Sequence, residues 1–436
     1  MATHTPADRW ATGAAGLLLL VALAFGGGLK GGGDALVHAM GVLALGVALT
    51  RWRWRRLGRT QQVMAWCLAF AVGLALLQLI PLPIGWYERL PERADIVADL
   101  HGAGLYPHWL SMTLDHWATL RALLSVTTFA AMWMLCTSLP MELRIRLLKL
   151  AVVAAIPLAL LGFAQSSMKL DTTGANAMFA NRNHFASLMA MLLPLAFVAA
   201  RESRSRQLPG GAVLWLATTV ILLLAAALSF SRTGFLLACL ASLAALLSQA
   251  NRRSLNPSGS TGALAALAVA AIAVGYFAFD RLDARFASDI STDLRWTLLS
   301  RGLPLLQAWL PWGSGLGTFG PVYGMTEPLQ SLGQYVAAPY AHDELLQVGI
   351  EAGWPGLLLA GTFVGSIAVA VAGAFRRHSP AGDWRRAAAI SAVVPLVHSL
   401  VDYPLRTFAC SLLLALLLSV CPQPPSRTMP ARGETP

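Results

Sequence analysis

A series of long apolar stretches is the feature that most constrains this chain. Their lengths are close to the ~20 residues that an α-helix needs to cross ~30 Å of hydrocarbon. Of the 436 residues, 56% are hydrophobic and 12% are charged, whereas a soluble domain carries roughly 25% charged residues. The stretches also lack the alternation of barrel strands. The sequence therefore predicts an all-α polytopic membrane protein with about 12 transmembrane helices, near residues 11–28, 35–50, 62–82, 118–138, 148–166, 184–200, 211–229, 233–249, 263–279, 354–375, 387–402 and 405–421.

Basic residues gather in the short loops between these stretches. Most of the 32 Lys and Arg residues lie near residues 9, 51–59, 144–149, 201–206, 252–253, 376–386 and 427–432. The positive-inside rule places such loops in the cytoplasm, so the net charge of +11 indicates membrane orientation and not a nucleic-acid partner.

The same rule sets the expected topology. Both termini should be cytoplasmic, and a long segment over residues 280–353, between the ninth and tenth predicted helices, should face outward. In a Gram-negative cell this outward side is the periplasm. We expect one transmembrane domain over residues 1–421 and a cytoplasmic tail over residues 422–436.

The outward segment concentrates the residues that can carry chemistry. Arg295 and Arg301 precede a glycine-rich run, "WGSGLGTFG". An arginine side chain suits phosphate because its planar guanidinium donates two parallel hydrogen bonds. Six residues separate the two arginines, so on one helix they point to different faces. The G-x-x-x-x-G-K-[ST] pattern of a phosphate loop is absent, so the arginines are the better candidates for anion binding.

The end of this segment, "AHDELLQVGIEAGWPG", reads as an amphipathic helix that enters the membrane. His342 lies at its N-terminal end, where the helix dipole disfavours a protonated imidazole. A neutral histidine can accept a proton from a sugar hydroxyl, as a general base must. Glu344 is the second candidate for that role. The alternative interpretation is a capping or interfacial histidine.

Two shorter outward loops add candidate ligands for a substrate. Arg232 lies in "SFSRTG" between two apolar stretches, and Arg182 and Asn183 lie in "NRNH" at the start of another. A fixed cation at the membrane surface is costly unless it is paired or solvated, so Arg232 is either a clamp for an anionic head group or an arginine that snorkels from a helix end. The "NRNH" residues either bind sugar and phosphate or cap a helix.

No metal motif accompanies these residues. The outward loops contain no D-x-D, no H-x-x-x-H and no pair of cysteines, which are the usual sources of metal ligands. A lipid-diphosphate leaving group can instead be neutralised by arginines. We therefore expect neither a metal nor another cofactor.

In these segments the sequence resembles the bacterial O-antigen ligase and O-antigen polymerase superfamily. "AHDELLQVGIEAGWPGLLL" is similar to its H-(N/D)-x-x-L-x-x-x-x-E-x-G-x-x-G signature, and "R…PWGSGLGTF", "SRTG" and "NRNHFA" fit the order of its other motifs. The resemblance covers about residues 150–375. Asp343 stands where many members have Asn.

The resemblance implies a multi-pass inner-membrane glycosyltransferase. Such enzymes take a glycan from undecaprenyl diphosphate and act at the periplasmic face without a metal. Ligases transfer it to lipid A–core, and polymerases transfer it to a second lipid-linked glycan. By the same resemblance, Arg232 and Arg295 hold the diphosphate, and His342 assists the acceptor hydroxyl.

Three functions therefore remain as alternatives from the sequence. The first is a ligase, and the second is a polymerase of O-antigen or exopolysaccharide. The third is a transporter or flippase for a lipid-linked glycan, whose polar groups should lie near the bilayer midplane. Here the charged residues lie mostly at the ends of the apolar stretches, which favours chemistry at the membrane surface.

Overall fold

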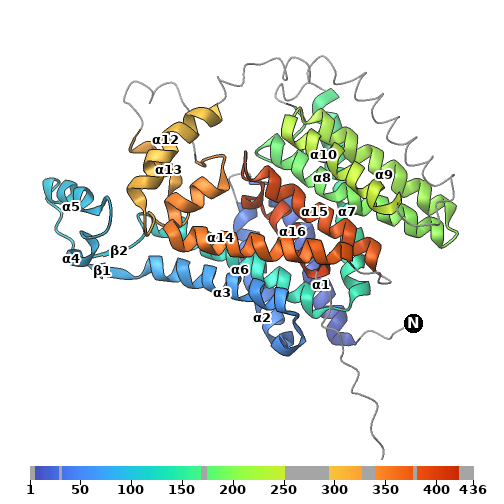
Figure 1. Cartoon of the computed structure of the whole chain (residues 1–436), viewed down its shortest axis with the longest axis horizontal. Helices are drawn as coiled ribbons and strands as arrows, with labels where there is room; N and C mark the ends of the chain where they lie inside the picture. The colour runs from blue at the N-terminus through green and yellow to red at the C-terminus, as the bar shows by residue number, and fades with distance from the viewer. Residues whose placement is uncertain are drawn as a thin grey trace, which may run out of the picture.

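A computed structural model describes residues 5–28, 32–167, 174–250, 294–326, 339–376 and 381–421. In these ranges the chain is a bundle of helices with one short two-stranded sheet (Figure 1). The elements are α1 (Pro6–Phe25), α2 (Gly32–Arg51), η1 (Trp54–Arg56), α3 (Arg59–Leu79), β1 (Pro81–Pro83), α4 (Ile84–Tyr87), α5 (Arg93–Gly102), β2 (Trp109–Ser111), α6 (His116–Ser138), α7 (Met141–Ser167), α8 (Arg182–Ser205), α9 (Pro209–Leu228), α10 (Arg232–Ala250), α12 (Leu294–Trp309), α13 (Phe319–Gly324), α14 (Glu344–Arg376), α15 (Gly382–His398), η4 (Pro404–Arg406) and α16 (Phe408–Val420).

Eight helices in the described ranges are long and apolar enough to cross a membrane: α1, α2, α3, α6, α7, α8, α9 and α14. Helices α10 and α16 are shorter apolar helices, and α15 covers most of the span predicted at residues 387–402. Each of these eleven helices overlaps one predicted apolar span. The remaining predicted span, residues 263–279, lies outside the described residues. Within the predicted outward segment at residues 280–353, residues 280–293 and 327–338 also lie outside them. The mostly helical, multi-pass class is supported, and the number of twelve spans stays a prediction.

Helix α8 forms the centre of the bundle. In the most apolar 18-residue stretch of α8, 94% of the residues are buried. In the corresponding stretches of α2, α3 and α14 the share is 22%, so most of their apolar side chains lie on the outside of the bundle. Helices α9, α10 and α15 pack around α8. From Phe185 to Ala200 this helix carries no charged residue, so it can be enclosed on all sides without burying an unpaired charge.

Ion pairs join the basic loops at one end of the bundle. Arg51 pairs with Asp8 at 2.5 Å, and Lys149 pairs with Glu202 at 2.8 Å. Trp384 also donates to Glu202 from the start of α15. These contacts join the N-terminal segment to the loop at Arg51, and the three loops at Lys149, Glu202 and Trp384 to one another; all five segments were predicted to be cytoplasmic.

The other set of loops meets at the opposite end. The backbone N–H of Ala180 donates to Gly27 at 3.1 Å, that of Ala409 donates to Gly26 at 3.2 Å, and that of Ala175 donates to Leu228 at 2.9 Å. The structure therefore separates the loops into the two predicted sets. Which end faces the cytoplasm stays a prediction from the distribution of Lys and Arg.

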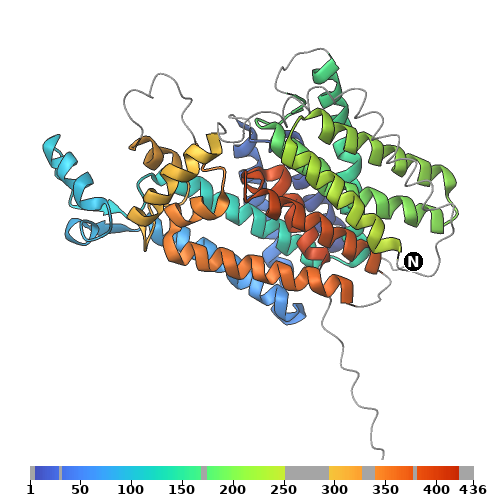
Figure 2. The same ribbon diagram turned by 45° about the horizontal axis from the view of Figure 1, so that its top comes forward.

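Helix α14 contains a break that separates its amphipathic start from its apolar remainder. Gly353 has φ +57° and ψ −151° inside the helix, a backbone geometry that residues with a Cβ rarely adopt. A Cβ at this position would lie 2.0 Å from the carbonyl oxygen of Pro311. The ribbon of α14 changes direction along its length (Figures 1 and 2), and Gly353 is the residue whose backbone is non-helical. The predicted amphipathic helix and the predicted span that follows it are thus both present and joined at the break.

An arm formed by β1, β2, α4 and α5 extends away from the bundle (Figures 1 and 2). Arg93 anchors it. This side chain is fully buried and donates to the carbonyl oxygens of Met112 at 2.7 Å and Gly313 at 2.9 Å. Its guanidinium also lies 4.7 Å from the ring centroid of Trp309 on α12. Arg93 therefore fastens the arm to the glycine-rich run.

Candidate active site

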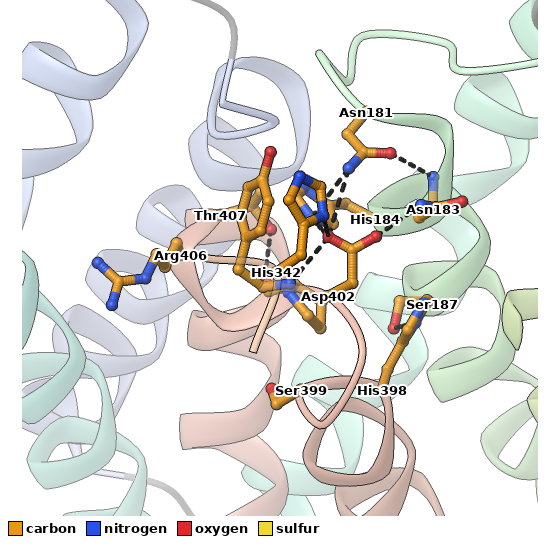
Figure 3. A network of polar contacts seen from close by, with 12 residues as sticks. Asn181, Asn183, His184, Ser187, His342, His398, Ser399, Asp402, Arg406 and Thr407 are labelled. Atoms are coloured by element: carbon orange, nitrogen blue, oxygen red, sulfur yellow. Dashed lines mark hydrogen bonds and ion pairs between the residues drawn. The ribbon is translucent and has the colours of Figure 1, made fainter. Parts of the chain in front are cut away.

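A buried carboxylate, Asp402, lies at the centre of the polar cluster in Figure 3. Helix α15 ends at His398, so Asp402 lies in the turn that follows it and not inside the span predicted to residue 402. Pro404 disfavours helical geometry at the preceding residue, and the backbone N–H of Tyr403 donates to Oδ1 of Asp402 at 2.9 Å. The Asp402 side chain is 0% exposed, so its charge must be compensated by neighbouring donors.

The start of α8 supplies the first of these donors. Asn183 donates from Nδ2 to Oδ2 of Asp402 at 2.5 Å, and His184 Nε2 lies 3.3 Å from Oδ1. Asn181 caps α8 by accepting from the backbone N–H of Asn183 at 2.9 Å, and its own Nδ2 lies 3.5 Å from Asp402. Asn181 therefore realises the capping interpretation of "NRNH", and binding of sugar or phosphate by Arg182 and Asn183 stays a prediction.

Arg295 and His342 approach the same carboxylate from two other parts of the chain. Arg295, on α12, places Nη2 3.4 Å from Oδ2 of Asp402, and 31% of its side chain is exposed. His342, just before α14, places Nδ1 3.2 Å from Oδ1, with 22% of its side chain exposed. The Nδ1 atom is buried and not aligned for a hydrogen bond. Contact with Asp402 on the Nδ1 side leaves Nε2 of His342 as the nitrogen that a substrate can reach.

These contacts keep Asp402 ionised. Burial raises the pKa of Asp402, but the contacts with His184 and His342 outweigh burial, and the pKa lies well below its usual value. The carboxylate is therefore a permanent negative charge at neutral pH, placed between two imidazoles and a guanidinium.

A second buried pair lies beside this cluster. Ser187 Oγ and Nδ1 of His398 are 2.9 Å apart, and both residues are fully buried. Nε2 of His398 has no hydrogen-bond partner among the described residues. The pair links α8 to the end of α15, one turn before Asp402, and so helps to fix the turn that carries the carboxylate.

Glu344, the second candidate base, is held by Arg406. Nε of Arg406 lies 3.0 Å from Oε1 of Glu344, and Nη2 lies 3.1 Å from Oε2. The same Nη2 is 3.5 Å from Oε2 of Glu351, which is 1% exposed. Arg406 thus joins two carboxylates of α14 to η4.

The backbone N–H groups of the glycine-rich run are occupied within the protein. Those of Ser314 and Gly315 donate to the carbonyl oxygens of Ile350 and Glu351, both at 2.9 Å. The N–H of Leu316 donates to Gln78 Oε1 at 2.9 Å. The run therefore fastens the break in α14 to α3, and these three groups are not available to a phosphate. This agrees with the absence of a phosphate-loop pattern.

The other predicted arginines lie in the same half of the bundle. Arg182 is the first residue of α8, next to Asn183, and Arg232 is the first residue of α10. Gly234 packs against Ala186 of α8 so closely that a Cβ would lie 2.4 Å from it. Arg301 is half-buried on α12, and none of the described residues pairs with it. The structure therefore brings Asn183, Arg295 and His342 together at Asp402 and places Glu344 against Arg406.

Asp402 and Arg406 are the residues that the sequence reasoning missed. Both lie in "VDYPLRT", a short turn between apolar stretches that carried no motif. The available signal was an acidic residue at the edge of an apolar span, a position where charge is costly and is often functional.

Fold and site together define a multi-pass membrane protein with a buried, charged site at one end of its helical bundle. Residues 217–361 match the family model described as O-antigen ligase. This segment contains Arg232, Arg295, Arg301, His342 and Glu344, and its match supports the resemblance of the chain to the O-antigen ligase and polymerase superfamily. Members of this family are glycosyltransferase-like enzymes. No curated protein matches the chain. Asn183, His184 and Asp402 lie outside the matched segment.

Proposed function

We propose that this chain is a ligase-like glycosyltransferase of the inner membrane. It moves a glycan from undecaprenyl diphosphate to a hydroxyl of lipid A–core at the periplasmic face, without a metal or another cofactor. The observation that carries the proposal is the contact of one buried carboxylate, Asp402, with both His342 and Arg295. A base and an anion ligand are thereby held beside each other, as transfer from a lipid diphosphate requires.

In the proposed step, the acceptor hydroxyl attacks the anomeric carbon of the donor sugar. The new bond joins the acceptor oxygen to that carbon, and the bond between the carbon and the diphosphate oxygen breaks. The hydroxyl proton passes to Nε2 of His342, and undecaprenyl diphosphate leaves with the bonding electron pair. Asp402, whose Oδ1 lies 3.2 Å from Nδ1, stabilises by its negative charge the imidazolium that forms, as an acidic residue does beside a catalytic histidine in hydrolases.

Arginines stabilise the charge on the leaving group. Arg295 contacts Asp402 through Nη2, and 31% of its side chain is exposed, so we propose that this exposed part binds the diphosphate. Arg232 and Arg182 are proposed as further diphosphate or glycan ligands, together with Asn183. Glu344, the earlier second candidate base, is tied to Arg406, so His342 is the stronger candidate.

The position of Asp402 favours an enzyme over a transporter. The carboxylate lies in the turn between α15 and α16, at the end of the bundle, whereas transporters bind substrate near the bilayer midplane. The polymerase alternative uses the same chemistry with a second lipid-linked glycan as acceptor.

The chemistry is tested with purified lipid-linked donor in detergent. We expect His342→Ala to insert and bind donor normally but to lose roughly 10²- to 10⁴-fold in transfer rate, because general-base catalysis contributes about that much. His101→Ala, at an exposed site on α5, is the matched control and should transfer glycan at the wild-type rate. Wild-type turnover in His342→Ala would remove the base role, and lost donor binding would make His342 a ligand instead.

A deletion strain separates the two acceptor classes. Loss of long glycan on lipid A–core, with lipid-linked polymer retained, indicates the proposed ligase. Single repeats on lipid A–core without long chains indicate a polymerase and would overturn the choice of acceptor.

A further inference from the structure

Arg406 contacts the chain on both sides of His342. Its guanidinium pairs with Glu344, two residues after His342, at 3.0 and 3.1 Å. The same group lies 5.5 Å from the ring centroid of Tyr340, two residues before His342. A single side chain therefore fixes both flanks of the proposed base.

The flanks need fixing because the backbone of His342 is strained. Its φ is +54°, a left-handed conformation that non-glycine residues seldom adopt. Such a conformation persists only where surrounding contacts determine it. The contacts here are specific: the backbone N–H of Ala341 donates to Gln347 Oε1 at 3.0 Å, and that of Glu344 donates to the carbonyl oxygen of Ser399 at 3.0 Å.

The contact at Ala341 depends on Arg406 through Gln347 and Glu351. Gln347, which holds Ala341, donates from Nε2 to Oε1 of Glu351 at 2.7 Å. The other oxygen of Glu351 has no hydrogen bond among the described residues, and Nη2 of Arg406 lies 3.5 Å from it. Without Arg406, a nearly fully buried carboxylate would lose this compensating charge, and the support of Gln347 would be disturbed with it.

The charge of Arg406 is already used within the protein. One guanidinium faces two carboxylates, Glu344 and Glu351, so the group as a whole is anionic. A diphosphate is attracted to uncompensated positive charge, which Arg406 does not offer. Its arrangement differs from the contact of Arg295 with Asp402, a carboxylate that other donors share.

We propose that Arg406 is a positioning residue, which holds His342 in its strained conformation with Nδ1 toward Asp402. It does so from η4, four residues after Asp402, so one turn of the chain carries both the orienting carboxylate and the side chain that fixes the backbone. The inference rests on the proposed role of His342 as the base.

The test measures kcat, the KM for lipid-linked donor and donor binding for Arg406→Gln, Arg406→Lys and the double variant His342→Ala/Arg406→Gln. Arg406→Gln should lose about 10²-fold in kcat, the cost of misplacing a reacting group by ~1 Å, with donor KM and binding within about twofold of wild type. Arg406→Lys cannot span Glu344 and Glu351 with a planar fork, so its kcat should also fall. The fall should be smaller than in Arg406→Gln because lysine keeps the positive charge.

The double variant distinguishes positioning from an independent effect. A residue that acts through His342 adds nothing once His342 is gone, so the double variant should have the rate of His342→Ala. Arg89→Gln, at an exposed site on the arm, is the matched control and should match wild type. If Arg406→Gln does not insert, Arg406→Lys and Glu344→Gln take its place, and each is expected to lower kcat with donor KM unchanged.

Three results would overturn the proposal. A raised donor KM with unchanged kcat would make Arg406 a donor ligand. Rate losses that multiply in the double variant would show that it acts independently of His342. Wild-type kcat in Arg406→Gln would remove the role altogether. A fully active His342→Ala is a different outcome, because it removes the proposed base and with it the premise of the positioning role.

Discussion

At the scale of single residues, Asp402 explains how distant parts of the chain meet. The carboxylate contacts the start of α8 through Asn183 and His184, α12 through Arg295, and the segment before α14 through His342. A buried carboxylate without these donors would take up a proton or disrupt the fold. Asp402 is therefore a structural requirement for the site, apart from its proposed part in the reaction.

This requirement predicts a pH-dependent loss of stability. A carboxylate whose folded-state pKa is depressed stabilises the fold above its unfolded-state pKa, near 3.9. That contribution is lost as pH falls through the folded-state pKa. The pKa of Asp402 is depressed in this way by its contacts with His184 and His342, against the effect of burial. Asp402→Asn should therefore be less stable than wild type by about 3 kcal/mol at pH 5, and the gap should shrink below about pH 4.

The measurement is thermal unfolding in detergent across this pH range. Asp99→Asn, on the exposed side of α5, provides the control and should follow wild type throughout. A gap that stays constant down to pH 3 would show that the charge of Asp402 does not stabilise the fold.

At the scale of elements, hydropathy predicts the helices and local motifs predict part of the site. The apolar spans near residues 62–82 and 211–229 coincide with α3 and α9 because a run of ~20 apolar residues has few alternatives in a bilayer. His342 was identified from the motif "AHDELLQVGIEAGWPG", and Arg295 from its place upstream of the glycine-rich run. Asp402 and Arg406 were not, because their side-chain partners lie between 55 and 221 residues away and a single sequence carries no record of such contacts.

The glycine-rich run shows the same limit of prediction from a single sequence. Its glycines indicated a close approach of the backbone, but the sequence did not say to what. The structure places Gly313 against Ala352 and Gly315 against Thr113, both with positive φ. The approach is to other parts of the protein, which a pattern of glycines alone cannot distinguish from an approach to a ligand.

The break in α14 gives a prediction at this scale. Gly353→Ala should destabilise the protein by about 1–3 kcal/mol and lower transfer activity, because the new Cβ meets Pro311 at 2.0 Å and the φ of +57° is strained for alanine. Gly365→Ala, on the same helix with open space around it, should be neutral or stabilising by up to ~1 kcal/mol. Thermal unfolding and transfer by both variants provide the comparison, and equal behaviour of the two would contradict a required break.

At the scale of the whole molecule, charge and site lie at opposite ends of the bundle. The end that carries Arg51, Lys149 and Arg201 holds the ion pairs with Asp8, Glu202 and Asp383. The end that carries Asp402 holds the arm and the glycine-rich run. A membrane protein with this asymmetry inserts with its basic loops in the cytoplasm, which would place the site on the periplasmic side, where a lipid-linked glycan awaits transfer in the proposed function.

Alkaline phosphatase fusions test this orientation, because that enzyme needs disulfides and these form in the periplasm and not in the cytoplasm. Fusions after Arg59 and after Arg206 should be inactive, since the loops near both residues lie at the basic end of the bundle. Fusions after Gly104, in the arm, and within residues 291–320 should be active. Two of the four sites are linked by the fold: Arg93 of the arm donates to Gly313, so the fusions after Gly104 and within residues 291–320 must give the same answer. Activity after Arg59 with none after Gly104 would show that the orientation is the reverse of the predicted one. The site would then face the cytoplasm, where the proposed periplasmic transfer could not occur.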